Sequence, residues 1–399
     1  MRRRRKYDFY LVVILAFITI GYFVYNHISA ESRGVDNYSA ALEIYKKSDY
    51  EKAYEEFGKI PSGSTLKHSA LFRQARCATN MDKRELAIKK YNRIVHSNAK
   101  SSISPISEYN MAILMYEMND KRAKKHFKKI IKKYSTSDYA IASNYYLGVI
   151  EIASPQKNEK KIAKSQAKAL IFFKTYLEQA PDGRFAIKSI DEIKKLNVKL
   201  TNYDNLLIAK SYYANGEYTK SKEYLNKTTL AESWSDFAKN EYKLGNKEKS
   251  NYYAEMGLTK HAANTSEKDV FEIVDNYIAT FPTRKEGIEK LVNMKLNSTG
   301  ADYVAYLNCN EVVATNVKEA CYRTLYEKYP NGQFSADSLY NLFITKYLQK
   351  KYYDAQRLGF LHLKKFPNVN SSPAVTYYMG KIAFKLKHYE NANSYYKQV

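Results

Sequence analysis

The fold of this 399-residue chain is decided by one stretch, Asp49-Tyr50-Glu51-Lys52-Ala53-Tyr54-Glu55-Glu56-Phe57-Gly58-Lys59-Ile60. In it the small residue Ala53 is followed four positions later by the aromatic Phe57 and seven positions later by the aliphatic Ile60. Positions spaced by four and by seven lie on one face of an α-helix. The stretch therefore predicts a helix with a single apolar face.

The same arrangement of a small residue and a following apolar residue recurs along the chain. Its copies are Ala53 with Phe57, Ala87 with Tyr91, Ala123 with Phe127, Ala169 with Phe173, Ser221 with Leu225, Ser250 with Ala254, Ala355, and Ala392 with Tyr396. The second copy begins 34 residues after the first, and the third begins 36 residues after the second. A period near 34 residues is typical of repeats made of two helices and a turn.

The small residue of each copy has a physical reason. Two antiparallel helices approach closely only where one of them presents little side-chain bulk at the crossing. We therefore expect the small residues and their aromatic partners to be buried and to fix the packing of the repeats.

The two helices of a hairpin are joined by short polar turns such as Asn215-Gly216-Glu217-Tyr218 and Leu244-Gly245-Asn246. The glycines of these turns suit the left-handed conformation of a helix C-cap.

These residues resemble the tetratricopeptide repeat family over most of residues 37–399, with weaker matches between residues 230 and 320. The tryptophan that is usual in the first helix is missing, and the proline that closes the second helix is present only in places. The resemblance implies an all-α fold, an α-solenoid of helical hairpins wound as a right-handed superhelix. It also implies that peptide segments or partner proteins bind in a concave groove.

The repeats and the N-terminus together predict the organisation of the chain. We expect a basic tail over residues 1–8, a transmembrane anchor over 9–26, the first part of the array over 37–200, degenerate hairpins over 201–265, and the last part of the array over 266–399.

A second resemblance comes from helices that end at an aromatic residue followed by proline. The pairs are Phe281-Pro282, Tyr329-Pro330 and Phe366-Pro367, with Ala180-Pro181 and Tyr134-Ser135 as looser versions. The pattern is similar to repeat proteins of bacterial envelopes, and in length and irregularity most similar to the N-terminal superhelix of soluble lytic murein transglycosylases. The Glu-Ser pair of that enzyme family occurs at Glu31-Ser32 and Glu232-Ser233, without the Gly-Leu-Met-Gln segment that follows it in the family. We therefore expect no catalytic residue within these 399 residues.

The N-terminus predicts the compartment. An uncharged apolar run over residues 9–25 follows a basic cluster, Arg2, Arg3, Arg4, Arg5 and Lys6. As a helix this run would rise about 26 Å, close to the thickness of a hydrocarbon core, and the basic cluster would stay in the cytoplasm. We expect a single-pass protein of the inner (cytoplasmic) membrane whose repeats lie in the periplasm or elsewhere outside the cytoplasm. A cleaved signal peptide ending at residues 28–30 is the alternative, and it predicts export as well.

The charge of the chain favours anionic partners. Lys and Arg number 65 against 41 Asp and Glu, a formal net charge of +24 that is spread along the chain. Candidate anionic partners are therefore lipid head groups, peptidoglycan or another anionic wall polymer, and nucleic acid. The concave groove of the repeats adds envelope proteins or peptide segments as candidates. Nucleic acid is not expected outside the cytoplasm. The alternative is that most lysines simply lie on solvated helix faces.

The residue types that bind metals or cofactors are sparse. Cys77, Cys309 and Cys321 form an odd and widely spaced set, which excludes a disulfide framework and has no metal-ligand spacing. A bridge between Cys309 and Cys321 and a pair of buried thiols are both compatible with their separation. The seven histidines are isolated, and no phosphate-binding, zinc-protease or nucleophile-elbow motif occurs. We expect no cofactor and no metal.

The 39 tyrosines include several doublets that suggest a contact surface. They are Tyr145-Tyr146, Tyr212-Tyr213, Tyr252-Tyr253, Tyr352-Tyr353, Tyr377-Tyr378 and Tyr395-Tyr396. In a doublet one ring can enter the core while its neighbour offers a flat amphipathic surface to a partner. Core packing is the simpler explanation for most of these rings.

The sequence stops inside the second helix of a repeat, which leaves two functional hypotheses. If the chain is complete, we expect a non-enzymatic, membrane-anchored scaffold that binds envelope proteins or wall polymer. If it is a fragment, we expect the superhelical part of a peptidoglycan lytic transglycosylase whose catalytic domain lies beyond Val399.

Overall fold

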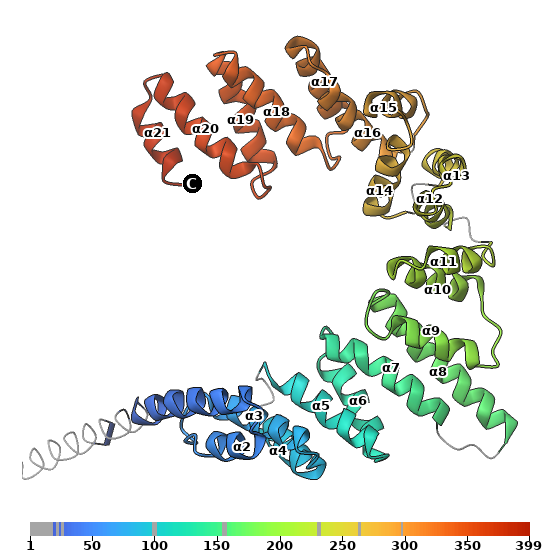
Figure 1. The fold of residues 1–399 in the computed structure, drawn as a ribbon. Helices are drawn as coiled ribbons and strands as arrows, with labels where there is room; N and C mark the ends of the chain where they lie inside the picture. Colours follow the sequence, from blue (N-terminus) through green and yellow to red (C-terminus); the bar gives the residue numbers. More distant parts are fainter. Residues whose placement is uncertain are drawn as a thin grey trace, which may run out of the picture. The chain divides into compact units, whose positions relative to one another are not determined.

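The computed structural model describes residues 19–20, 24, 28–97, 102–153, 158–229, 233–261, 265–296 and 298–399. Within these ranges the regular secondary structure is entirely helical. The chain divides into two compact units, Met1–Lys199 and Leu200–Val399, and each is a series of antiparallel helical hairpins (Figure 1). An all-α helical repeat solenoid is therefore confirmed.

The first unit begins with a helix over residues 28–46. It continues with α2 (Tyr50–Gly58), α3 (Lys67–Asn80), α4 (Arg84–Ser97), α5 (Ser104–Glu117), α6 (Arg122–Lys133), α7 (Asp138–Ala153), α8 (Glu159–Gln179) and α9 (Ala186–Lys195). Helices α3, α5 and α7 are the first helices of their hairpins, and α4, α6 and α8 are the second helices.

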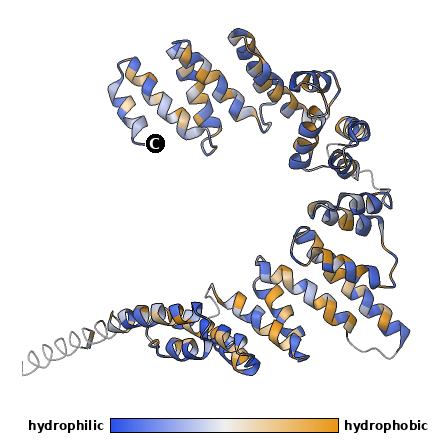
Figure 2. Ribbon diagram, in the orientation of Figure 1, coloured by the Kyte–Doolittle hydropathy of each residue, from blue (hydrophilic) through white to orange (hydrophobic). Residues whose placement is uncertain are grey.

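The second unit contains six hairpins. They are α10 (Asn202–Ala214) with α11 (Tyr218–Leu225), α12 (Trp234–Lys243) with α13 (Lys247–Lys260), α14 (Glu267–Ile278) with α15 (Arg284–Val292), α16 (Ser298–Glu311) with α17 (Thr315–Lys328), α18 (Ser335–Leu348) with α19 (Tyr352–Lys365), and α20 (Ser372–Lys385) with α21 (Tyr389–Tyr396). Apolar and hydrophilic residues are interspersed along the helices (Figure 2). Second helices such as α4 bury one side, with Ala87, Tyr91 and Ile94, whereas first helices such as α10 are buried on several sides.

The turns within the hairpins repeat one backbone motif. In seven hairpins the turn contains a residue with a positive φ between 55° and 79°: Ser48, Asp82, Asn119, Gly216, Gly245, Lys350 and Lys387. In six of these turns, all except the one at Ser48, the next backbone N–H bonds back to the carbonyl five residues earlier, as from Lys83 to Ala78 (2.8 Å) and from His388 to Ala383 (2.8 Å). This is the Schellman pattern, which satisfies the last carbonyls of the first helix. The left-handed conformation expected for Gly216 and Gly245 is confirmed.

One connection between helices occurs in both units with proline, glycine and phenylalanine at the same positions. The two copies are Ala180-Pro181-Asp182-Gly183-Arg184-Phe185 and Tyr329-Pro330-Asn331-Gly332-Gln333-Phe334. In each copy the glycine N–H bonds to the carbonyl three residues earlier, at 3.0 Å in the first and 2.9 Å in the second. The phenylalanine of each copy caps the following helix, α9 or α18. The two units therefore place the residue before this phenylalanine, Arg184 or Gln333, in equivalent positions.

A glycine marks the closest helix crossing of the second unit. A Cβ added to Gly257 on α13 would lie 1.7 Å from Cε3 of Trp234 on α12. Trp234 is buried, and its ring therefore occupies the space that any larger residue at position 257 would need. Gly257 lies seven residues after Ser250, the small residue that the repeat pattern predicted on this helix, and was not itself part of that prediction.

The cysteine pair that the sequence left open is resolved as a bridge. Cys309 on α16 and Cys321 on α17 form a disulfide, with their Cα atoms 5.5 Å apart. The bond closes a loop of 12 residues and ties the two helices of one hairpin together. Cys77 is a buried free thiol on α3.

The predicted transmembrane helix over residues 9–26 is wrong. In the parts of the chain that the structure describes, no helix combines the length and the apolarity that a bilayer crossing requires. Most of 9–26 and the basic cluster at residues 2–6 lie outside the described residues, and the helix over 28–46 carries charges such as Glu31 and Arg33. The predicted placement as a single-pass inner-membrane protein with periplasmic repeats conflicts with the same finding, and it is wrong as well.

Candidate functional site

The structure places ten of the eleven predicted repeat-packing residues in the interior. They are Ala53, Phe57, Ala87, Tyr91, Ala123, Phe127, Ala169, Phe173, Ala355 and Ala392. The eleventh, Tyr396 on α21, is 41% exposed. Its ring still packs on α20, because a Cβ added to Gly380 would lie 2.6 Å from that ring. These residues hold hairpins together and leave the chemistry of the surface to other positions.

In five of the six tyrosine doublets one ring is more buried than the other. The more exposed members are Tyr213, Tyr252, Tyr353, Tyr377 and Tyr396, and they range from half-buried to 74% exposed for Tyr353. In the remaining doublet both Tyr145 and Tyr146 are half-buried, and Tyr145 stacks on Phe185 with ring centroids 4.4 Å apart. In these five doublets one ring therefore packs in the interior and the other lies nearer the surface.

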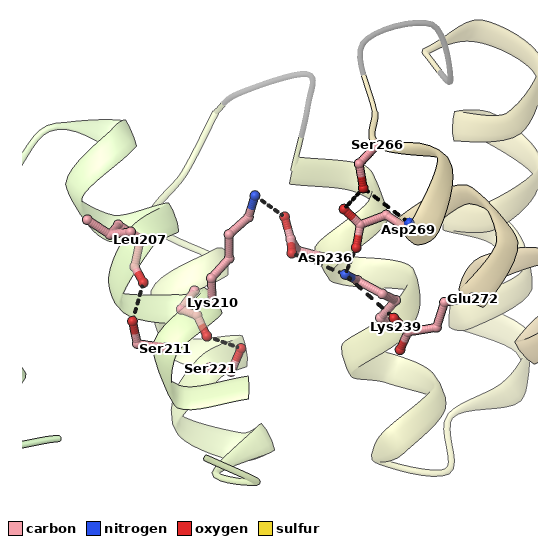
Figure 3. A network of polar contacts seen from close by, with 10 residues as sticks. Leu207, Lys210, Ser211, Ser221, Asp236, Lys239, Ser266, Asp269 and Glu272 are labelled. Carbon is pink, nitrogen blue, oxygen red and sulfur yellow. Dashed lines mark hydrogen bonds and ion pairs between the residues drawn. The ribbon is translucent and has the colours of Figure 1, made fainter. Parts of the chain in front are cut away.

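The main charged cluster lies on three consecutive first helices of the second unit. It consists of Lys210 on α10, Asp236 and Lys239 on α12, and Asp269 and Glu272 on α14, and we call it the ion-pair ladder (Figure 3). Lys239 is its centre and is only 7% exposed. The ladder joins side chains that are up to 62 residues apart in the sequence.

Lys239 contacts every carboxylate of the ladder. Its Nζ donates a hydrogen bond to Oδ1 of Asp269, and it lies 3.8 Å from Oδ1 of Asp236 and 4.0 Å from Oε2 of Glu272. The other oxygen of Asp236 lies 3.5 Å from Nζ of Lys210. Charges therefore alternate across the three helices, positive on α10, both signs on α12, and negative on α14.

Neighbouring polar groups fix the geometry of the ladder. Ser266 caps α14: its hydroxyl accepts from the backbone N–H of Asp269 (3.2 Å) and donates to Oδ2 of the same residue (2.6 Å). The hydroxyl of Tyr213 donates to Oε1 of Glu272 at 2.9 Å. The ring of Tyr213 also lies 5.6 Å from the ammonium group of Lys239.

Burial and charge shift the pKa values of the ladder in opposite directions. Burial alone would lower the pKa of Lys239, but the three carboxylates together raise it above its ordinary value. Burial raises the pKa of Asp236, and the two lysines only partly offset this effect. Burial also acts to raise the pKa of Asp269, but the hydrogen bonds from Lys239 and Ser266 hold it below the ordinary value. Asp269 is therefore stabilised as a charged group, whereas Asp236 is not.

The sequence analysis did not find the ladder, although a signal exists. Asp236 and Lys239 are three residues apart, and Asp269 and Glu272 repeat the same spacing 33 residues later. Charged pairs that recur at the repeat interval occupy the same face of consecutive first helices. Only the packing of α12 against α14 shows that the lysine of one pair meets the carboxylates of the next.

A pocket lies on the first unit, between the first helices α5 and α7 and the connection from α8 to α9. Its volume is about 350 Å³. We call it the aromatic pocket, after the side chains that form most of its wall: Tyr109, Tyr139, Tyr176, Arg184 and Phe185. The rings of Tyr109 and Tyr139 lie 5.3 Å apart, and those of Tyr176 and Phe185 lie 6.0 Å apart. The pocket therefore combines flat apolar surfaces with one guanidinium group.

No metal-binding arrangement is found in the described parts of the chain, where no group of three or more His, Cys, Asp or Glu side chains could hold an ion.

The Glu-Ser pairs that resemble the transglycosylase motif were expected to have no catalytic role. In the first pair, Glu31 accepts a hydrogen bond from the backbone N–H of Thr65 at 2.8 Å. Glu232 lies outside the described residues. Glu31 on the helix over 28–46 therefore acts as a structural acceptor for the turn that precedes α3.

Comparison with known families identifies the repeat type. A family model named tetratricopeptide repeat matches residues 69–101 and 107–137, which cover most of the α3–α4 and α5–α6 hairpins. No curated protein matches the chain. The similarity to lytic transglycosylase superhelices is not among these findings.

Solved structures of repeat proteins also align with the chain. The C-terminal part of a TPR repeat-containing protein from Cytophaga hutchinsonii is 15% identical, with 76% of this chain and 99% of that chain covered and a TM-score of 0.29. A tetratricopeptide repeat protein from Parabacteroides merdae is 10% identical, with 77% of this chain and 96% of that chain covered and a TM-score of 0.25.

The family match falls on two hairpins whose left-handed turn residues, Asp82 and Asn119, and buried small residues, Ala87 and Ala123, have counterparts in other hairpins of the chain. The chain therefore contains tetratricopeptide repeats at residues 69–101 and 107–137, within an all-α array of helical hairpins of the kind that forms scaffolds for protein interactions.

Proposed function

We propose that this chain is a scaffold that binds extended segments of partner proteins along the surfaces of its first helices. The single observation that carries the proposal is the ion-pair ladder. Its buried centre is satisfied internally, but its outer members remain in contact with solvent: 48% of the Lys210 side chain, 31% of Asp269 and 35% of Glu272 are exposed.

Half-exposed charges on a rigid support suit peptide recognition. Lys210 can donate to backbone carbonyls or carboxylates of a ligand, and Glu272 can accept from its N–H groups or lysines. Both side chains are already oriented by their partners in the ladder, so that binding would cost little additional ordering. Repeat arrays use such surfaces for elongated ligands, since each repeat adds a similar strip of surface.

A peptide-library selection against the full chain tests this proposal. Peptides selected on the wild type are measured with the double variant Lys210→Gln and Glu272→Gln, which keeps side-chain size and removes both charges. Binding should weaken by about tenfold or more, since each lost charge-assisted hydrogen bond has that order of effect. The matched control is Glu248→Gln with Lys249→Gln, two exposed charges of the second helix α13, and it should leave binding unchanged.

Two results would refute the proposal. One is a selection that yields no binding peptide. The other is a set of peptides whose affinity responds to the α13 control and not to the ladder variant, because the ligand would then bind on second helices.

The identity of the partner stays a prediction. Envelope proteins and peptidoglycan or another anionic wall polymer are favoured by the charge of +24. Sedimentation with purified peptidoglycan at low and high salt tests the polymer. Binding that disappears in high salt would mean attraction by net charge, and binding that persists would mean a specific site.

A further inference from the structure

Arg184 carries a positive charge that no carboxylate of the described chain neutralises. Its Nη2 donates to the hydroxyl of Tyr109 at 3.1 Å, and its guanidinium carbon lies 4.4 Å from the ring centroid of Phe185. These two contacts hold the group at the wall of the aromatic pocket. Among the described residues no ion pair joins it to a carboxylate, although Asp138 lies in the same wall.

The orientation of Arg184 leaves most of its hydrogen-bonding capacity for a ligand. A guanidinium group has five N–H donors in a planar fork, and one of them is used by Tyr109. A fork that is already held in place is well suited to a carboxylate, because less side-chain freedom is lost on binding. The residue itself is exposed, so that a ligand can reach it.

The rest of the pocket is suited to one apolar side chain. Its volume of about 350 Å³ is near the lower end of small-ligand pockets, which span about 300–1,000 Å³. Buried rings of Tyr109, Tyr176 and Phe185 line it, so that an aromatic guest can meet them edge to face. Gly183 keeps the pocket in shape, because a Cβ there would lie 2.3 Å from the hydroxyl of Tyr176.

The second unit contains a natural variant of this arrangement. In its copy of the connection Gln333 replaces Arg184, and the backbone N–H of Gln333 bonds to Oδ2 of Asp302 at 3.2 Å. The following Phe334 stacks on Tyr306 with centroids 4.6 Å apart. The connection therefore accommodates a neutral residue at this position, and the arginine of the first unit is not needed for the turn itself.

We propose that the aromatic pocket binds an aromatic side chain of a partner peptide in which an aspartate or glutamate lies next to that aromatic residue. The ring enters between Tyr139, Tyr176 and Phe185, and the neighbouring carboxylate pairs with Arg184. This inference rests on the proposed scaffold function and assigns one ligand class to one position of the first unit.

Labelled peptides measured by fluorescence anisotropy test the pocket in the full chain. The reference peptide has one phenylalanine between two aspartates in a glycine and serine background. Its partners replace the phenylalanine by alanine or the aspartates by asparagines. With the wild type, both replacements should weaken binding by about tenfold or more. With Arg184→Gln, the aspartate and asparagine peptides should bind equally, while the preference for phenylalanine should remain.

Lys128→Gln is the matched control, because it removes one exposed positive charge from α6 of the same unit. It should leave the aspartate preference unchanged. Ala142→Leu, which fills the pocket from α7, should abolish the phenylalanine preference, and circular dichroism checks that both pocket variants keep their helices.

The inference is overturned if no peptide binds, if the two charge variants have equal effects, or if aspartate and asparagine peptides bind the wild type equally. The library peptides selected on the wild-type chain separate this failure from that of the scaffold proposal. If they bind the wild type and respond to the ladder variant while the phenylalanine peptides do not bind, only the pocket assignment is wrong. If no library peptide binds the wild type either, the scaffold proposal is wrong too.

Discussion

Replacing Lys239 with methionine should destabilise the second unit by about 3 kcal/mol, because it removes the central cation of the ion-pair ladder. The substitution leaves Asp236, Asp269 and Glu272 around a site that no longer holds a positive charge. Removing one partner of a buried ion pair costs about 3–5 kcal/mol. The lower end applies here, since Asp269 and Glu272 are each about one third exposed and water can solvate them. Methionine keeps a flexible apolar stem of similar length, so that little packing is lost.

The chain provides its own probe for this experiment. Trp234 is its single tryptophan, and it is buried on α12 next to the ladder. Urea unfolding followed by tryptophan fluorescence therefore reports on the second unit alone. Lys249→Met on α13 is the control, and as an exposed substitution it should change stability by no more than about 0.5 kcal/mol. A Lys239→Met midpoint equal to that of the control would refute the reasoning.

The negative charges of the two ladder aspartates, Asp236 and Asp269, should contribute differently to the stability of the folded state at neutral pH. The pKa of Asp269 is lowered in the folded state, so that its charge contributes stability above the unfolded pKa of about 3.9, and this contribution is lost as the pH falls through the folded pKa. The pKa of Asp236 is raised by burial, so that its charge is disfavoured in the folded state. Asp269→Asn should therefore destabilise more than Asp236→Asn at pH 7, and the difference should shrink below about pH 4. Equal losses at both pH values would contradict this assignment.

Three further predictions concern the backbone and the packing of the second unit. Gly257→Ala should lower its stability by about 1–3 kcal/mol in the same fluorescence assay, since the new methyl group must displace the ring of Trp234; an unchanged midpoint would mean that the ring moves freely. Lys387→Gly should raise stability by about 0.5–1 kcal/mol in thermal unfolding, since a lysine at φ 63° is strained and a glycine is not. A lower stability of the variant would show that the contacts of the lysine side chain contribute more than its backbone strain costs. Reduction of the Cys309–Cys321 bridge should lower stability by about 3 kcal/mol, the cost expected for a loop of this length. The double variant with Cys309→Ser and Cys321→Ser should be as stable as the reduced protein. A stability that does not change with reductant would exclude the bridge in solution.

Features that depend on residues a few positions apart could be predicted from the sequence, because helix and turn geometry relates such residues directly. Ala53 and Phe57 are four residues apart on one helix, so that their shared burial follows from helix geometry. Gly216 and Gly245 lie between two amphipathic segments, where a tight turn with a left-handed residue closes the hairpin. The apolar run over 9–25 shows the limit of this approach, because hydropathy alone favoured a transmembrane helix that the described residues do not support.

Features that depend on contacts between repeats were decided only by the tertiary structure. Whether Cys309 and Cys321 pair depends on the angle between α16 and α17, which their spacing of 12 residues does not define. From the sequence, Arg184 can be predicted only as an exposed residue of a turn. The packing of α5, α7 and α8 is what places it beside an aromatic pocket.

By itself the sequence determined that the chain folds into helical hairpins of the tetratricopeptide type, because each hairpin is encoded by contacts between residues a few positions apart and the pattern recurs many times. The tertiary structure decided which surface charges meet. Lys239 reaches Asp269 only because α12 and α14 pack side by side, and the recurring spacing of the two charged pairs does not by itself show that the lysine of one pair meets the carboxylates of the next.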